Sequence, residues 1–248
     1  VLVIFGFQIG MSFAQVYGEQ VRYQDMGYDL WSVTSGVYTG MRGILPPIQR
    51  YIYLYIPLIT MGLMSREYQS GSIKLLYSSP VQNTSIIMGK FLSMMVYGGV
   101  LMAVLGVFVV FSAITIVNFD YPLVLSGMLG LYLLILAYSA IGLFMSSITK
   151  YQVVAAIGTL AVLAVLNFIG DVGQDYDLVR HITYWLSISG RAYPFIDGLV
   201  ASDNIFYFLI VIGFFLALSI FKLNTEKTIM SLKIKILKYC GIVLSLIH

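Results

Sequence analysis

The chain has 248 residues, of which 59% are hydrophobic and 10% charged, with a mean hydropathy of +0.90 and a net charge of +3. Soluble globular domains carry about 25% charged residues. A chain so poor in charge could not cover a soluble surface with polar atoms. The composition therefore excludes a soluble core protein and indicates residence in a membrane.

Windows without charged side chains predict where the chain crosses the membrane. A crossing helix needs about 20 apolar residues, and its backbone polar groups must bond within the segment. Four charge-free windows and two apolar stretches upstream of them predict an all-α membrane protein with six transmembrane helices. We expect these helices at residues 1–15, 46–65, 89–117, 122–148, 152–170 and 203–221.

Both ends of the sequence lie in apolar stretches. A secretory signal peptide is the alternative to a first span over residues 1–15, but the basic segment that such a signal needs is absent there. Residues 239–248 are too short to cross a membrane and resemble the truncated start of a seventh helix. We therefore expect a six-helix domain over 1–221, and a basic cytoplasmic linker with the start of a further helix over 222–248.

The positions of lysine predict the orientation in the membrane, because cytoplasmic loops carry an excess of Lys and Arg. Alternating spans place three segments on one side, namely 66–90, 146–152 and 222–238. These segments hold every lysine of the chain, and the opposite side holds nine acids, five arginines and no lysine. The lysine-rich side is therefore predicted to be cytoplasmic.

No sequence motif indicates a catalytic centre. The chain contains no HExxH, CxxC or GxSxG pattern and no phosphate-binding glycine loop of the GxxxxGK[ST] type. Apart from Lys90 and Asp203 at the first residues of their spans, Arg50 is the one charge inside a predicted span. Its side chain either reaches the outer interface, within an aromatic belt formed by Tyr51, Tyr53 and Tyr55, or lines a substrate path.

The polar segment 66–90 separates the second and third predicted spans. Gly71 can end the preceding helix, and Pro80 stops the following turn. Between them, helical spacing puts Ile73, Leu76 and Tyr77 on one side of a short amphipathic helix. This helix either lies passively at the interface or is a docking element that offers Leu75, Leu76 and Tyr77 to a partner.

The same segment resembles the signature of type-2 ABC-transporter permeases. The pattern E-x-x-x-G-[ST]-x-x-L-L-x-[ST]-x-P-[VI], followed by I-x-x-G-K, is matched at Glu67, Gly71, Ser72, Leu75, Leu76, Ser78, Pro80, Val81, Ile86, Gly89 and Lys90. Residues 184–208 are similar to the outer re-entrant segment before the sixth helix of these permeases. Over 184–200 we expect two short interfacial helices, interrupted at Gly190 and Pro194. The branch associated with bacterial gliding motility is the most similar.

The resemblance implies a multi-pass permease subunit, an exporter, in the inner membrane of a bacterium. The segment 66–90 would be the coupling helix, seated on a separate ABC ATPase subunit. Its coupling residues would be Glu67, Gly71, Ser72, Leu75, Leu76, Tyr77, Pro80, Gly89 and Lys90. Two permeases would pair as a homodimer or heterodimer, with an auxiliary membrane protein of the gliding type fused or encoded nearby.

The resemblance also implies that this chain is no enzyme and binds no cofactor, since ATP would be bound and hydrolysed on the partner. We expect no nucleic-acid partner. Two other classes of function are considered. One is a non-transporting anchor or scaffold of a motility or secretion apparatus. The other is an intramembrane enzyme, which the lack of paired polar catalytic groups in the spans opposes.

Overall fold

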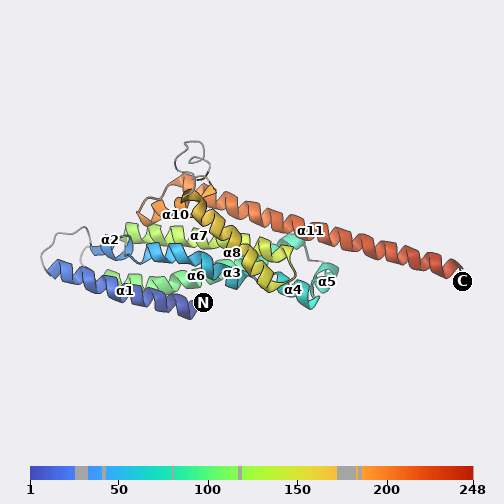
Figure 1. The fold of residues 1–248 in the computed structure, drawn as a ribbon, viewed down its shortest axis with the longest axis horizontal. Helices are drawn as coiled ribbons and strands as arrows, with labels where there is room; N and C mark the ends of the chain where they lie inside the picture. The colour runs from blue at the N-terminus through green and yellow to red at the C-terminus, as the bar shows by residue number, and fades with distance from the viewer. Residues whose placement is uncertain are drawn as a thin grey trace.

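The computed structural model describes residues 1–25, 33–40, 43–79, 81–116, 119–171, 183 and 186–247, which form helices and no strand (Figure 1). The helices are α1 (Leu2–Asp25), α2 (Val33–Tyr38), α3 (Leu45–Thr60), α4 (Ser65–Ser70), α5 (Ile73–Ser78), α6 (Asn83–Thr115), α7 (Tyr121–Ile148), α8 (Gln152–Phe168), the 3-10 turn η1 (Ile169–Asp171), α10 (Ile188–Ile196) and α11 (Ser202–Ile247). The prediction of an all-α chain is confirmed for these residues.

Helix α7 is the centre of the bundle. It packs against α3, α6, α8, α10 and α11, and most of its side chains are buried. Two glycines let neighbours approach closely. A Cβ atom at Gly130 would lie 2.4 Å from Cβ of Phe195 on α10, and one at Gly142 would lie 2.2 Å from Oγ1 of Thr60 on α3. Larger residues at these two positions would push α10 and α3 away from the central helix.

Three helices of the described part are long and apolar enough to cross a membrane, namely α6, α7 and residues 202–229 of α11. In α6 and α11 fewer than a third of the residues in the most apolar window are buried, so large apolar side chains face outward from both. Outward apolar faces of this length suit contact with lipid. The predicted count of six spans is not confirmed, because α1 is long enough but not apolar enough, and α8 and α3 have only 17 and 16 residues.

The second predicted span, residues 46–65, is divided between two helices. At 1.5 Å per residue α3 is about 24 Å long, less than the hydrocarbon thickness of about 30 Å. It ends at Thr60 because Ser146 of α7 binds the following turn. The Ser146 hydroxyl accepts from the backbone N–H groups of Met64 (2.9 Å) and Ser65 (3.1 Å) and donates to the Met61 carbonyl. This side chain replaces helical backbone bonds, and α4 begins after the turn.

The remaining helix boundaries also differ from the bounds predicted from the charge-free windows. Helix α1 continues to Asp25, and α6 begins at Asn83 instead of residue 89, because polar residues extend both helices beyond their apolar parts. Helix α11 runs without interruption past residue 221. The division into two parts at that residue stays a prediction.

Tyr184 and Trp185 lie outside the described residues, so the expected pair of short helices over 184–200 stays a prediction. Leu186 is helical and Ser187 is not, and α10 follows as one helix. Gly190 and Pro194 do not interrupt it. Ser187 caps its start by accepting from the Gly190 N–H at 3.1 Å. Burial of α10 side chains against α7, α8 and α3 holds the helix through Pro194, whose missing N–H costs one backbone bond.

Candidate functional site

Two polar regions lie at opposite ends of the helix bundle (Figure 1). We call the first the loop end: it consists of α4, α5, the start of α6 and residues 222–226 of α11. The second, the α10 end, consists of α10 and the adjoining starts of α3 and α11. The predicted coupling residues gather at the loop end, and Arg50 lies at the α10 end.

The turn between α4 and α5 depends on Gly71. This residue ends α4 with φ at +74°, in the left-handed region that favours glycine. A Cβ atom there would meet nothing within 4 Å. Backbone conformation, and not lack of space, therefore selects glycine here. The hydroxyl of Ser72 lies beside this turn, 2.8 Å from that of Ser70.

Glu67 and Lys90 join α4 to α6. The Lys90 Nζ atom lies 2.6 Å from the Glu67 Oε1 atom and also donates to the carbonyl of Leu63. Both side chains are more than 70% buried, so water screens the pair only partly. The pairing partner of Glu67 is thus a basic group of its own loop. The pair links the chain segments on both sides of α5.

A second carboxylate, Glu226 of α11, holds α4 and α5 together. Its Oε2 atom accepts hydrogen bonds from the hydroxyls of Tyr68 (2.6 Å) and Tyr77 (3.2 Å). Its Oε1 atom lies 3.1 Å from the Lys222 Nζ atom, one turn earlier on α11. We call these four residues the Glu226 clasp. Nearby, the Asn83 amide of α6 donates to the Asn224 side chain of α11 at 2.7 Å.

The environment of the Glu226 clasp keeps both tyrosines neutral. Burial, reinforced by the hydrogen bond to Glu226, raises the pKa of Tyr68 far above its ordinary value. Burial and the charge of Glu226 raise the pKa of Tyr77 to about 12, although the neighbouring Tyr68 hydroxyl works in the opposite direction. Both hydroxyls therefore keep their protons and donate to the carboxylate throughout the physiological pH range.

The two faces of α5 have different surroundings. Ile73 is buried, Leu76 and Tyr77 pack against the core, and Lys74 and Leu75 are exposed. Leu75 has 75% of its surface exposed. Of the three residues expected to face a partner, Leu75 is exposed, while Leu76 and Tyr77 are half-buried against the core. Their docking on a partner stays a prediction. The Glu226 clasp turns Tyr77 inward, and Leu76 lies on the same side of the helix.

The last members of the motif are less informative. Gly89 is exposed on α6, and a Cβ atom there would meet nothing within 4 Å. Pro80 lies outside the described residues.

The sequence analysis did not predict a role for Glu226. The signal for it was weak: it is an acid within the strongly basic segment 222–238, but nothing nearby in the sequence indicates that its partners are tyrosines.

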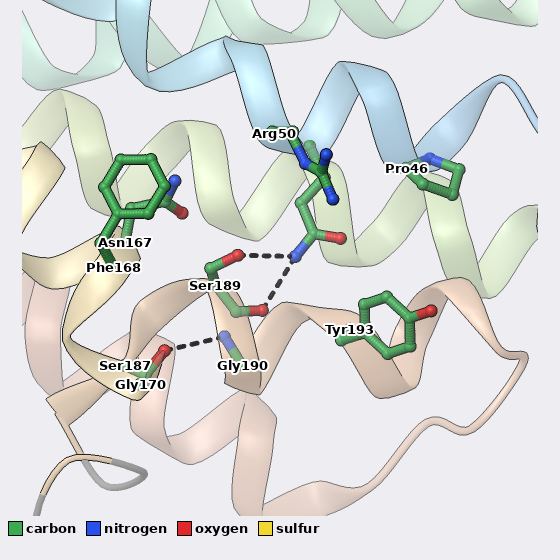
Figure 2. Close-up of a pocket in the computed structure, with 10 residues that line it drawn as sticks. Pro46, Arg50, Asn167, Phe168, Gly170, Ser187, Ser189, Gly190 and Tyr193 are labelled. Atoms are coloured by element: carbon green, nitrogen blue, oxygen red, sulfur yellow. Dashed lines mark hydrogen bonds between the residues drawn. The ribbon is translucent and has the colours of Figure 1, made fainter. Parts of the chain in front are cut away.

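At the α10 end, Arg50 lines a pocket of about 420 Å³ between α3, α8 and α10 (Figure 2). Arg50 is exposed, and it has neither a hydrogen bond nor an ion pair with any described residue. Beside it, the buried Gln49 amide donates to the carbonyl (2.8 Å) and the hydroxyl (3.2 Å) of Ser189 on α10. Asn167, Phe168 and Tyr193 are among the residues that form the walls of the pocket.

A buried arginine fixes α10 beside this pocket. The Arg191 guanidinium lies 3.2 Å from an Asp203 carboxylate oxygen and donates to the Asn204 side chain at 3.0 Å, both at the start of α11. It also lies over the Tyr207 ring, 5.5 Å from the ring centre. Only 3% of Arg191 is exposed. These contacts hold α10 against the start of α11.

Comparison with known protein families identifies the chain. The family model for the ABC-2 family transporter protein matches residues 3–174, which span α1 to η1 and include the whole of the segment 66–90. The chain belongs to the ABC-2 transporter family. No protein of curated function matches it. Membership makes this chain a permease-type membrane component of an ABC transporter, and the family associates with an ABC ATPase. The Glu226 clasp joins the matched region to α11, which lies beyond it.

Proposed function

We propose that this ABC-2 protein is the permease subunit of an exporter and that its ATPase, a separate subunit, docks on α5. The observation that carries the proposal is the exposure of Leu75 on a helix whose other face is anchored. An exposed leucine on a fixed helix is preorganised to fill an apolar cleft, because little conformational freedom is lost on binding.

The contacts around α5 supply a route for movement. A partner that displaces α5 pulls on α11 through Tyr77 and Glu226. Displacement of α5 also reaches α4 through the turn at Gly71, and Glu67 of α4 is paired with Lys90 of α6. Both α6 and α11 pack against the central helix α7, so a shift at the loop end reaches the middle of the bundle. The permease would thus respond to ATP hydrolysis without binding ATP.

The proposal includes a location and an assembly. The loop end faces the cytoplasm of a bacterium, the chain lies in the inner membrane, and two permeases form a homodimer or heterodimer around the substrate path. The direction of transport is export. The gliding-motility branch and its auxiliary membrane protein stay a prediction, which the genes on either side of this one would test.

Replacing Leu75 by Asp tests the docking. Burial of a leucine stabilises a contact by roughly 1.5–3 kcal/mol before the costs of association, so the variant should bind the ATPase about 10- to 100-fold more weakly. Co-purification with the co-expressed ATPase and nucleotide-dependent transport are the measurements. Leu199→Asp is the matched control, because Leu199 is 66% exposed at the opposite end. The double replacement of Leu75 and Leu76 is unsuitable, since Leu76 packs against the core.

A non-transporting anchor is the competing function. If Leu75→Asp inserts normally and keeps wild-type ATPase binding and activity, α5 is not the docking element, and the proposed coupling is wrong. If the ATPase binds but no nucleotide-dependent transport occurs in sealed vesicles with candidate lipid, peptide or polymer cargo, the result favours the non-transporting anchor over the exporter. The Leu199→Asp control separates loss of docking from general damage by an added charge.

A further inference from the structure

The pocket at the α10 end has a strongly biased chemistry. Arg50 supplies a permanent positive charge and five N–H donors. The Asn167 amide accepts from the Tyr138 hydroxyl at 3.4 Å through its oxygen, which leaves its N–H₂ group to the pocket. Ser189 accepts from Gln49 and retains its own hydroxyl proton. No carboxylate is among the described residues that line this pocket.

The rest of the wall is apolar and aromatic. Phe168, at the end of α8, is 49% exposed, and Tyr193 of α10 is 52% exposed. Figure 2 shows Phe168 and Tyr193 on opposite sides of the polar groups. The Phe168 ring is held edge to face by Tyr53 of α3, with ring centres 5.9 Å apart. A ligand with both an anionic and a hydrocarbon part would meet suitable groups here.

The floor of the pocket is fixed before any ligand arrives. Gln49 is 3% exposed, and its two hydrogen bonds tie α3 to Ser189. Arg191 holds α10 to α11 from the other side. Arg50 therefore projects from a rigid frame, and a guanidinium can bind a phosphate or carboxylate group through two parallel hydrogen bonds.

From this arrangement we propose that the pocket between α3, α8 and α10 binds the anionic group of an amphiphile, of the phosphate type, with Arg50 as the principal ligand. Asn167 and Ser189 supply further donors, and the hydrocarbon part lies along Phe168 or Tyr193. This inference deepens the proposed function by naming a class of cargo, and it rests on that function only for the statement that the bound molecule is moved. Binding itself needs no ATPase.

The test measures binding to the purified full chain in neutral maltoside detergent without an ATPase. The thermal unfolding midpoint is recorded against dihexanoyl-phosphatidylglycerol, dihexanoylglycerol and inorganic phosphate. We expect a saturable rise with the phosphatidylglycerol and none with dihexanoylglycerol, which has the same acyl chains without phosphate. In Arg50→Gln the half-saturating concentration should rise at least about tenfold. Arg22→Gln is the control, because Arg22 is also an exposed arginine.

A second variant guards against an effect on folding. Asn167→Asp keeps an acceptor for Tyr138 but adds a negative charge to the pocket, so it should weaken binding at least as much as Arg50→Gln. The proposal is overturned if wild type and Arg50→Gln have the same half-saturating concentration. It is also overturned if dihexanoylglycerol raises the unfolding midpoint as much as the phosphatidylglycerol does. If inorganic phosphate alone raises the unfolding midpoint as much, the proposal of an amphiphile is wrong and the pocket is a site for free anions. Loss of transport in Leu75→Asp with lipid binding intact concerns the proposed function only.

Discussion

The two ends of the bundle use charge in opposite ways. At the loop end, a carboxylate on α11 receives hydrogen bonds from tyrosines that lie 158 and 149 residues earlier in the chain. At the α10 end, the buried Arg191 donates to a carboxylate on α11 that lies only 12 residues later. The first arrangement joins distant segments, and the second closes a local loop. The difference teaches that the position of α5 depends on a distant part of the chain, whereas α10 is fixed to α11 by a residue close to it in sequence.

The largest expected effect tests whether the two ends face different compartments. The single cysteine of the chain, Cys240, is first replaced by Ser. Single cysteines then replace Lys74 at the loop end and Leu199 at the α10 end, and intact cells are treated with an impermeant thiol reagent. Both positions are exposed in the described structure. We expect complete labelling at 199 and none at 74 until the cells are opened. The reverse pattern would invert the orientation and remove the docking site from the cytoplasm.

Loss of Arg191 should be the most destabilising change at the α10 end. Arg191→Met removes two charge-assisted hydrogen bonds and leaves the Asn204 side chain, which is 4% exposed, without this donor. The bond to the buried Asn204 contributes about 1.5–3 kcal/mol, and the bond to the exposed Asp203 adds less than about 1 kcal/mol because water screens it. We therefore expect a loss of about 2–3 kcal/mol. Thermal unfolding in detergent is the measurement. A midpoint no lower than that of Arg22→Met would show that the local loop is not closed by Arg191.

At the loop end, the two tyrosines of the Glu226 clasp should differ from each other. Tyr68→Phe removes the shorter bond to Glu226, at 2.6 Å, and we expect a loss of about 1.5–2 kcal/mol. Tyr77→Phe removes the longer bond, at 3.2 Å, and we expect about half as much. The unfolding midpoint and the ratio of ATP hydrolysed to substrate moved should both change.

A double-mutant cycle separates the Glu226 clasp from general packing. In a Glu226→Gln background, Tyr68→Phe should lower the free energy of unfolding much less than it does in the wild type, because the charged acceptor is already absent. Additive losses would show that Tyr68 stabilises the loop end through its ring alone. The transport ratio would then remain unchanged in Tyr68→Phe.

The smallest expected effect compares two glycines of the same motif. Gly71→Ala should destabilise by about 1 kcal/mol, because alanine is strained at a φ of +74°. Gly89→Ala should raise the free energy of unfolding by about 0.5–1 kcal/mol. Gly89 lies within helix α6, on its exposed side, and a Cβ atom there has open space around it. Midpoints that move in the same direction would contradict the left-handed turn between α4 and α5.

The sequence supported good predictions where the signal was local. In the described part, the predicted windows 89–117, 122–148 and 203–221 each lie on one of the three helices that are long and apolar enough to cross a membrane. The spacing of Ile73, Leu76 and Tyr77 correctly placed them on one side of α5, because a helical period of 3.6 residues is a property of the segment itself. The boundaries were less accurate, since helices such as α6 continue into polar residues.

The candidate sites show where local reasoning stopped. The motif identified Glu67 and Lys90, and the structure joins them. The exposed face of α5 could not be chosen from its sequence, because Leu75 and Leu76 are identical in chemistry and differ only in what lies next to them. Glu226 supplies that neighbour from far along the chain. Likewise, the sequence shows Arg50 only as a single charge, because the pocket around it is formed by residues of α8 and α10.

The amino-acid sequence by itself determined that this chain is a helical membrane protein with a polar, glycine-punctuated segment between two apolar helices. These properties depend on the burial of about 20 consecutive residues and on the conformations open to glycine, which are both local. The tertiary structure decided the rest. It ended α3 with a hydroxyl of α7, turned Tyr77 toward α11 and left Leu75 exposed. Those outcomes depend on side chains that meet only after the helices pack, so no window along the chain contains them.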